Sequence, residues 1–118
     1  MISKIITKLN TLHPTFPIYG NEIMEEEVNT SPSYFLYRNT NRMRRGANGR
    51  GLYREFNLFF VTTEGLEIDI ATIAETLSDG TGLYFVNSEE DYGKLMAIDK
   101  SAMMITMTFT YPVKVCFS

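Results

Sequence analysis

Cysteine, histidine and tryptophan are scarce in this sequence of 118 residues, which has one cysteine, one histidine and no tryptophan. A lone cysteine cannot form a disulfide within the chain, which is typical of a protein that folds in a reducing compartment. The first residues, MISKIITKLNTLHP, lack the continuous apolar core and the small-residue cleavage site of a signal peptide. No apolar run approaches the ~20 residues that a membrane helix needs. We therefore expect a soluble protein that folds inside the cell and has no membrane partner.

The scarcity of reactive side chains argues against an enzyme. His13 stands beside a proline at the predicted end of a helix, and one imidazole without a partner specifies neither a general base nor a metal site. Cys116 is close to the C-terminus, with no acid or base predictably near it. The acidic stretch 88–93 lacks the oxygen spacing of a calcium loop, and the glycines of 46–51 match no nucleotide-binding motif. We expect no catalytic residue, no metal and no cofactor.

Apolar residues, in contrast, make up 44% of the chain and charged residues 21%, which is the composition of a globular domain. A chain of this length can bury a core as one domain, 1–118, without a disulfide or a metal. Its first element is a helix over about 2–12, because apolar residues recur there at helical spacing. His13 and Pro14 end this helix, since proline disfavours helical geometry in the residue before it.

The central part of the chain alternates strands with one helix. This helix begins after Gly65: its apolar stripe runs to Leu77, and Glu64, Glu67 and Asp69 suit the positive end of its dipole. Strands are predicted before it at 18–28, 33–38 and 52–62, and after it at 82–87, where an acidic turn, 88–93, follows.

Apolar and mainly threonine positions alternate over 103–116, so one face of this last strand is buried. Pro112 cannot donate a ladder hydrogen bond, which indicates an edge position or a bulge near the end of the strand. The order of elements is then α-β-β-β-α-β-β. This order predicts an α+β domain, with a mixed, mainly antiparallel sheet of about five strands and both helices on one face.

All the arginines of this chain fall within residues 38–54, although its net charge is −3. They lie in and around a long Arg- and Gly-rich hairpin loop at about 42–51. Hairpin loops usually have about 2–5 residues, and longer ones tend to carry function. The residues are Arg38, Arg42, Arg44, Arg45, Arg50 and Arg54.

Three interpretations of this arginine stretch remain open. The first is a solvated hairpin tip without a partner. The second is nucleic-acid binding, since arginine binds phosphate bidentately and Tyr37, Tyr53 and Phe56 are near in sequence to stack on bases. The acidity of the whole chain argues against this interpretation. The third is a protein–protein contact, since arginine pairs with carboxylates and is enriched at interfaces.

The third interpretation has a partner surface within the same sequence. Glu25, Glu26 and Glu27 form an acidic block in the first predicted strand, where successive carboxylates lie on opposite faces and cannot share one metal ion. A basic loop and an acidic strand on one subunit suit a head-to-tail contact, which closes into a ring when the rotation allows. The predicted contact residues are Arg42, Met43, Arg44, Arg45, Arg50, Glu25, Glu26 and Glu27.

The order of these elements resembles that of a family of phage proteins. The chain is similar, over nearly its whole length, to the tail terminator or head–tail joining (tail completion) proteins of long-tailed bacteriophages such as lambda. The stretches that carry the resemblance are IYGNEIMEEE, YFLYR, REFNLFFVTTEG, EIDIATIAETL, GLYFVNSEEDYGK and the closing YPVKV.

The resemblance implies a structural virion protein and neither an enzyme nor a cofactor. In that family, small α+β subunits form a hexameric ring on the end of the tail tube, which stops tube growth and joins the tail to the head. The implied partners are further copies of the chain, the tail tube protein and the head–tail connector protein, while DNA passes through the lumen without sequence-specific binding. The implied location is the virion tail, after assembly in the host cytoplasm. The alternative is a small nucleic-acid-binding or regulatory protein whose arginine loop contacts phosphates.

Overall fold

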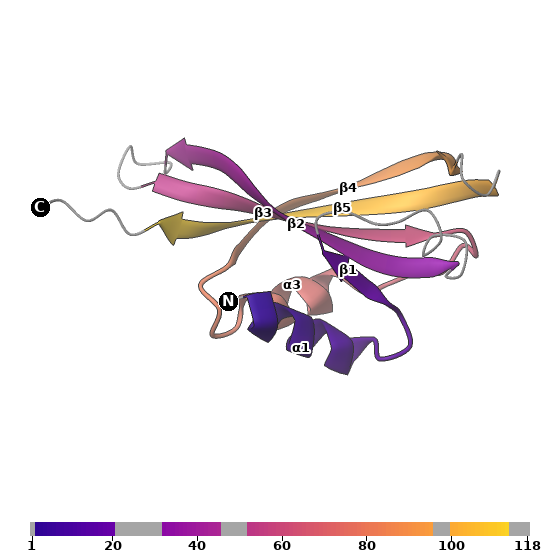
Figure 1. Ribbon diagram of the computed structural model, residues 1–118, viewed down its shortest axis with the longest axis horizontal. Coiled ribbons are helices and arrows are strands. Elements are labelled where there is room, and N and C mark those ends of the chain that lie inside the picture. The colour runs from indigo at the N-terminus through magenta and orange to yellow at the C-terminus, as the bar shows by residue number, and fades with distance from the viewer. Residues whose placement is uncertain (1, 21–31, 46–51, 96–99, 114–118) are drawn as a thin grey trace, which may run out of the picture.

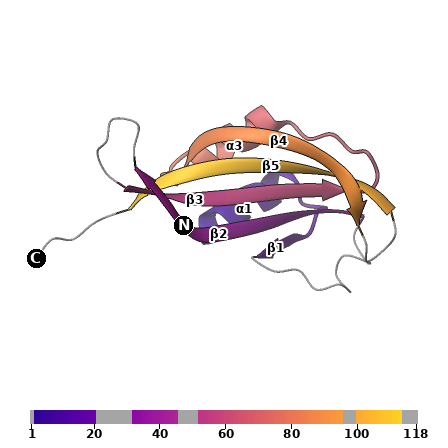
Figure 2. The same ribbon diagram turned by 90° about the horizontal axis from the view of Figure 1, so that it is seen from above.

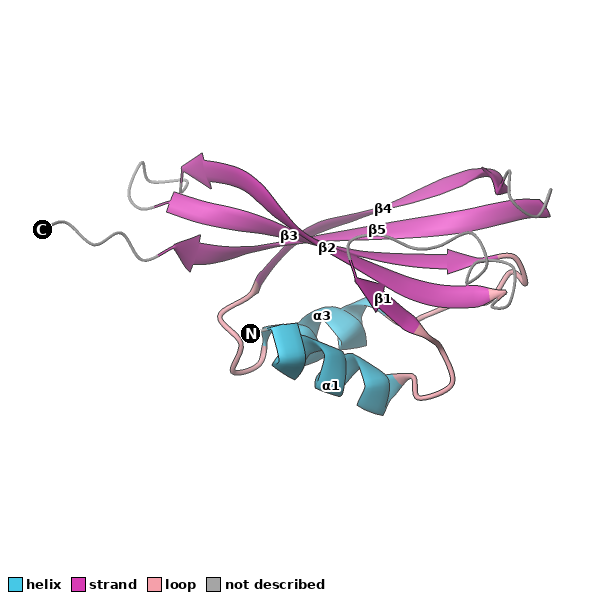
Figure 3. Ribbon diagram, viewed as in Figure 1, coloured by secondary structure: helices cyan, strands magenta, loops and turns pink. Residues whose placement is uncertain are grey.

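The computed structural model describes residues 2–20, 32–45, 52–95 and 100–113. These residues form a five-stranded sheet with two helices, which confirms the predicted α+β class and order (Figure 1, Figure 3). The elements are α1 (Ile2–Leu12), β1 (Ile18–Gly20), β2 (Ser33–Arg45), β3 (Leu52–Thr62), α3 (Ile70–Ser78), β4 (Tyr84–Leu95) and β5 (Lys100–Val113).

The strands lie in the order β1-β2-β3-β5-β4. β1 runs parallel to β2 and the other neighbours are antiparallel, so the sheet is mixed but mainly antiparallel, as predicted. β3 and β5 pair along the whole of β3, from Leu52 opposite Val113 to Thr62 opposite Met103. This pairing leaves β4 at one edge of the described sheet and β1 at the other.

Both helices cover the same face of the sheet. Figure 1 shows α1 and α3 on one side, and Figure 2, seen from above, shows the strands in front of both helices. The helical period of α1 and the two-residue period of β3 and β5 therefore direct their apolar side chains into one core. This buried cluster includes Phe35, Phe56, Phe60 and Phe109 from the sheet and Ile5, Leu9, Ile73 and Leu77 from the helices.

The second helix begins later than predicted. Gly65 has a positive φ of 69°, and α3 starts only at Ile70, with Asp69 as its N-cap. The Asp69 carboxylate accepts hydrogen bonds from the Thr72 N–H at 3.2 Å and from Thr72 Oγ1 at 2.7 Å. Of the three acidic residues assigned to the helix start, only Asp69 therefore has that role. The Glu64 carboxylate instead accepts a hydrogen bond from Ser33 Oγ at 2.9 Å.

The predicted acidic turn at 88–93 is wrong, because this segment is part of β4. Its residues pair with β5 from Ser88 opposite Met107 to Gly93 opposite Ala102. The segment has no alternation of apolar and polar residues, and its side chains are exposed. Apolar and polar residues alternate regularly in β5, and hydrogen bonding to β5 holds 88–93 in the extended conformation of a strand.

Two other strand boundaries differ from the prediction. β2 continues to Arg45, because its residues beyond Asn39 pair again with β3 after an irregularity. Residues 42–45 of the predicted loop 42–51 therefore belong to the strand, and 46–51 lie outside the described residues. β1 is described over Ile18–Gly20, and the rest of the predicted strand 18–28 lies outside the described residues. The same holds for the last predicted residues of β5, 114–116.

Pro112 lies where the sheet is locally open. β5 is flanked by β3 and β4, but its described pairing with β4 ends where Thr110 faces Tyr84. Beyond that point Pro112 faces only Tyr53 of β3. A residue without an N–H is tolerated there, because the strand has one described neighbour instead of two.

Candidate protein interface

Residues 40–45 of β2 and 52–54 of β3 form what we call the basic hairpin, which projects past the ends of both helices (Figure 1). At its end Arg44 faces Tyr53 and Arg45 faces Leu52 in the antiparallel register. The Met43 side chain, opposite Arg54, is 43% exposed. The backbone thus brings four of the predicted contact residues, 42–45, to one projecting element. Arg50 and Glu25–Glu27 lie outside the described residues, so their predicted contact stays a prediction.

A β-bulge separates the basic hairpin from the body of the sheet. Asn39 faces Phe56 and Met43 faces Arg54, so three residues of β2, 40–42, lie opposite the single residue Glu55. Bulges bend a strand and increase its twist. The bulge accounts for the bend at the end of β2 in Figure 1, which turns the hairpin away from the helices.

Arg38 and Arg54 do not belong to the tip of this hairpin. The guanidinium carbon of Arg38 lies 6.0 Å from the ring centroid of Phe59, a cation–π contact on the sheet. Arg54 is partly buried between β2 and β5, and its Nε has no hydrogen-bond partner among the described residues. Arg38 therefore lies on the body of the sheet, and Arg54 lies within the basic hairpin but away from its tip.

Two of the three aromatic residues considered for base stacking belong to the core instead. Phe56 is completely buried, and Tyr37 stacks on it with centroids 6.1 Å apart and an interplanar angle of 19°. Tyr37 also lies against Gly20, where any Cβ would collide with its ring. This packing leaves Tyr53 as the only one of these three aromatic residues outside the core and beside the arginines.

The edge strand β4 carries a second charged surface, which we call the acidic edge: Glu89, Glu90 and Asp91, all exposed. β4 is also unusual in its exposed apolar side chains. The exposed fractions are 61% for Tyr84, 39% for Phe85, 41% for Val86 and 76% for Tyr92. An edge strand with exposed apolar residues is a surface on which another chain can pair. The single lysine of β4, Lys94, lies beyond the acidic edge, opposite Ser101.

A groove of about 420 Å³ lies beside the acidic edge, between the chain segment 65–70 and the β4–β5 hairpin. Ile105, only 2% exposed, and Met103 belong to its sheet side. Glu67 comes from the 65–70 side and Glu90 from β4, so each wall has one carboxylate. Sequence reasoning missed this groove because it assigned 66–69 to a helix and 88–93 to a turn. Its lining residues are Gly65, Leu66, Glu67, Ile68, Ile70, Glu90, Tyr92, Met103 and Ile105.

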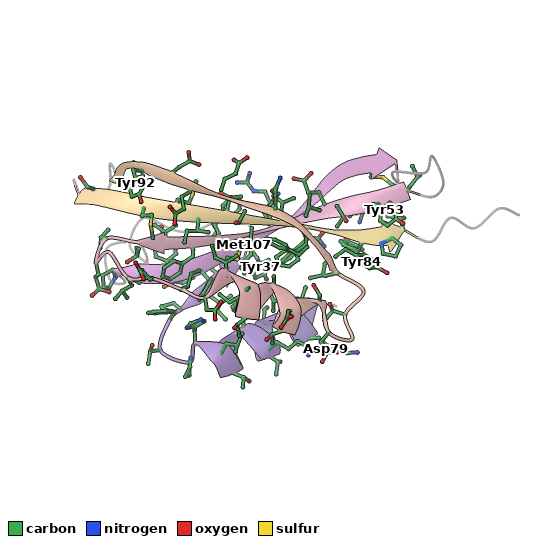
Figure 4. All side chains as sticks on the ribbon, turned by 180° about the vertical axis from the view of Figure 1, so that it is seen from behind. Tyr37, Tyr53, Asp79, Tyr84, Tyr92 and Met107 are labelled. Carbon is green, nitrogen blue, oxygen red and sulfur yellow. The ribbon has the colours of Figure 1, made fainter. Side chains whose placement is uncertain are left out.

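The groove and the end of the basic hairpin lie far apart. The molecule measures 52 × 26 × 23 Å, and Figure 4 shows Tyr53, at the start of β3, and Tyr92, in the groove, toward opposite ends of its long axis. Arg44 faces Tyr53, and Tyr92 faces Met103. One copy therefore presents its basic hairpin away from its own groove.

The lone histidine is a packing residue at the edge of the core. The His13 ring stacks on Phe16 with centroids 5.5 Å apart and contacts Phe35 at 5.6 Å. Burial lowers the pKa of His13 below its usual value. Within the ranges that the structure describes, no group of three or more His, Cys, Asp or Glu residues is placed to hold a metal ion. Cys116 lies outside those ranges.

Neither described helix is long and apolar enough to cross a membrane. The described surface instead offers two oppositely charged elements, the basic hairpin and the acidic edge, on one elongated α+β subunit. No protein-family model and no curated protein sequence matches this chain.

Proposed function

We propose that this protein is a non-enzymatic assembly protein whose copies associate head to tail into a ring. The observation that supports this most is the separation of charge along the subunit: the basic hairpin projects at one end, and the acidic edge and its groove lie toward the other. Different surfaces that meet between copies make a heterologous contact, which closes into a ring when the rotation allows.

The two surfaces supply complementary parts of the association. Opposite charges on exposed elements steer the encounter and set its orientation, but exposed ion pairs add little affinity. The apolar side chains of β4 can supply burial, and the backbone of this edge strand can supply hydrogen bonds. An acidic run alone is common on a solvated edge strand. Its position next to the exposed ring of Tyr92 favours an interface.

In keeping with the resemblance to tail terminators of long-tailed bacteriophages, we assign the ring to the end of the tail tube. There it stops tube growth and joins the tail to the head. Its partners are further copies of this chain, the tail tube protein and the connector protein, and DNA passes through the lumen without sequence-specific contacts. The protein acts in the virion tail and needs no cofactor.

Light-scattering mass and negative-stain electron microscopy of the purified protein, with and without tail tubes, test this proposal. We expect a discrete ring, in solution or on tube ends, and its loss in the double variant R44E/R45E. The control is K4E/K8E, which makes the same charge change on α1. Both variants should keep the wild-type circular dichroism spectrum. A protein that is monomeric with and without tubes overturns the proposal.

The alternative, phosphate binding by the same arginines, makes a different prediction for salt. Affinity for nucleic acid should fall linearly on a log–log plot as salt rises, because counterions are released from the phosphates. An assembly held by apolar burial should lose mainly its association rate. A monomer that binds DNA with a steep salt dependence would favour the alternative.

A further inference from the structure

We infer that the groove between residues 65–70 and the β4–β5 hairpin is the binding site for Met43 and its flanking arginines from a second copy of the chain. This inference rests on the proposed head-to-tail assembly and identifies both sides of the contact. It replaces Glu25–Glu27, as the acidic partner of the arginines, with Glu67 and Glu90.

The distribution of exposed apolar side chains supports this pairing. Among the described residues, six large apolar side chains are exposed. Two of them, Leu66 and Tyr92, line the groove, and Met43 is on the basic hairpin. The basic hairpin thus has one apolar side chain that needs cover, and the groove is an apolar surface at the other end of the subunit. The other three, Tyr84, Phe85 and Val86, lie at the start of β4 and outside the groove.

The charges of the two surfaces also match. The groove has an apolar floor that includes Met103 and Ile105, and one carboxylate on each wall. On the hairpin, Met43 has an arginine on each side in the chain, Arg42 and Arg44. Successive side chains of a strand alternate between its two faces, so a strand that lays Met43 on the apolar floor has the neighbouring arginines on its outer face, where they can turn toward the carboxylates of the two walls.

The size of the groove suits a strand end. Pockets that hold a whole small molecule measure about 300–1,000 Å³, and this groove, at about 420 Å³, falls in the same range. An adjoining hollow of about 550 Å³ shares Gly65, Tyr92 and Met103 with it and extends the surface toward Thr62. The hairpin of the same copy projects toward the opposite end of the 52 Å axis, so the hairpin that enters the groove must come from a second copy.

Disulfide cross-linking between two batches of protein tests the contact. Both batches carry Cys116→Ser; one adds Met43→Cys, and the other adds Leu66→Cys and a tag that changes its mass. After mild oxidation of the mixture, we expect a mixed dimer on a non-reducing gel. The matched control replaces Leu66→Cys with Ser3→Cys on the exposed side of α1, and its mixed dimer should be several-fold weaker.

Charge exchange provides a second readout that a loss of folding cannot imitate. The variant E67R/E90R should raise the concentration at which half the protein assembles by about tenfold or more, since close charge pairs at interfaces couple by about 1.5 kcal/mol or above. The variant R42E/R44E should do the same. A mixture of the two variants should assemble again, because each supplies the surface that the other lacks.

The outcomes separate this inference from the proposed function. If wild-type protein assembles but Met43→Cys and Leu66→Cys cross-link no better than the control, the groove assignment is wrong and assembly uses another surface. If wild-type protein stays monomeric up to ~1 mM, where an association of about −4 kcal/mol would be half complete, if it also forms no ring on tail tubes, and if no mixed dimer forms, both are wrong. A mixed dimer without rings supports the groove and contradicts the ring.

Discussion

Replacing Thr62 with valine tests a small hydrogen-bond network that fixes the chain leading into the groove wall. Thr62 ends β3 and is 1% exposed. Ser33 Oγ lies 2.7 Å from Thr62 Oγ1 and 2.9 Å from Glu64 Oε2, and the Glu64 N–H donates to Thr62 Oγ1 at 3.1 Å. An ionised carboxylate only accepts, so Ser33 donates to Glu64 and Thr62 donates to Ser33. Each hydroxyl therefore donates one bond and accepts one.

Valine keeps the shape of threonine but removes both bonds of its hydroxyl. Each neutral bond contributes about 0.5–1.5 kcal/mol net, and together they contribute about 2 kcal/mol. Ser33 Oγ also loses the hydrogen bond that it accepts from Thr62, and water cannot easily replace this bond because Ser33 is only 3% exposed. At about 2.1 cal/mol/K of unfolding entropy per residue, a loss of about 2 kcal/mol lowers the Tm of a chain this long by roughly 8 °C.

Urea unfolding followed by circular dichroism measures this loss as a lower midpoint at an unchanged m value. The control is Thr106→Val in β5, a half-buried threonine whose hydroxyl has no hydrogen bond to any described residue. It should change the unfolding free energy by less than about 0.5 kcal/mol. Equal stability of Thr62→Val and wild type, or equal losses in the two variants, would refute the network as a source of stability.

Three further predictions concern the core, a helix cap and a histidine. Leu58→Ala, at a completely buried position, should lower the unfolding free energy by about 2–5 kcal/mol in urea titrations; a loss below 1 kcal/mol would contradict the core assignment. Asp69→Ala should lower the Tm while Asp69→Asn nearly retains it, because asparagine also caps a helix; equal losses would contradict capping. Burial lowers the pKa of His13 in the folded state, so the folded state favours the neutral imidazole. The stability that depends on neutral His13 is therefore fully present above about pH 6.5 and is lost as the pH falls toward the lowered pKa. His13→Phe should flatten this part of the stability–pH curve, and an unchanged curve would exclude His13 as its cause.

Local periodicity was enough to determine the framework of this fold. The apolar residues of 2–12 recur at helical spacing, and Ile5 and Leu9 are buried accordingly. β3 has the predicted bounds, 52–62, and the alternation of β5 correctly predicts Ile105, Met107 and Phe109 as core residues. In these segments the neighbours along the chain already define which face is apolar, so the sequence carries the information.

The tertiary structure decided the features on which the candidate interface depends. Residues 88–93 are mainly polar and read as a turn, and only their pairing with β5 makes them part of the edge strand β4. Tyr37 and Phe56 read as possible stacking residues beside the arginines, and only their burial against each other assigns them to the core. The groove joins Glu67 to Glu90 and Ile105, residues that only the sheet register and the late start of α3 bring together. Contacts between distant segments depend on how the strands pair, and no local period of a sequence encodes that choice.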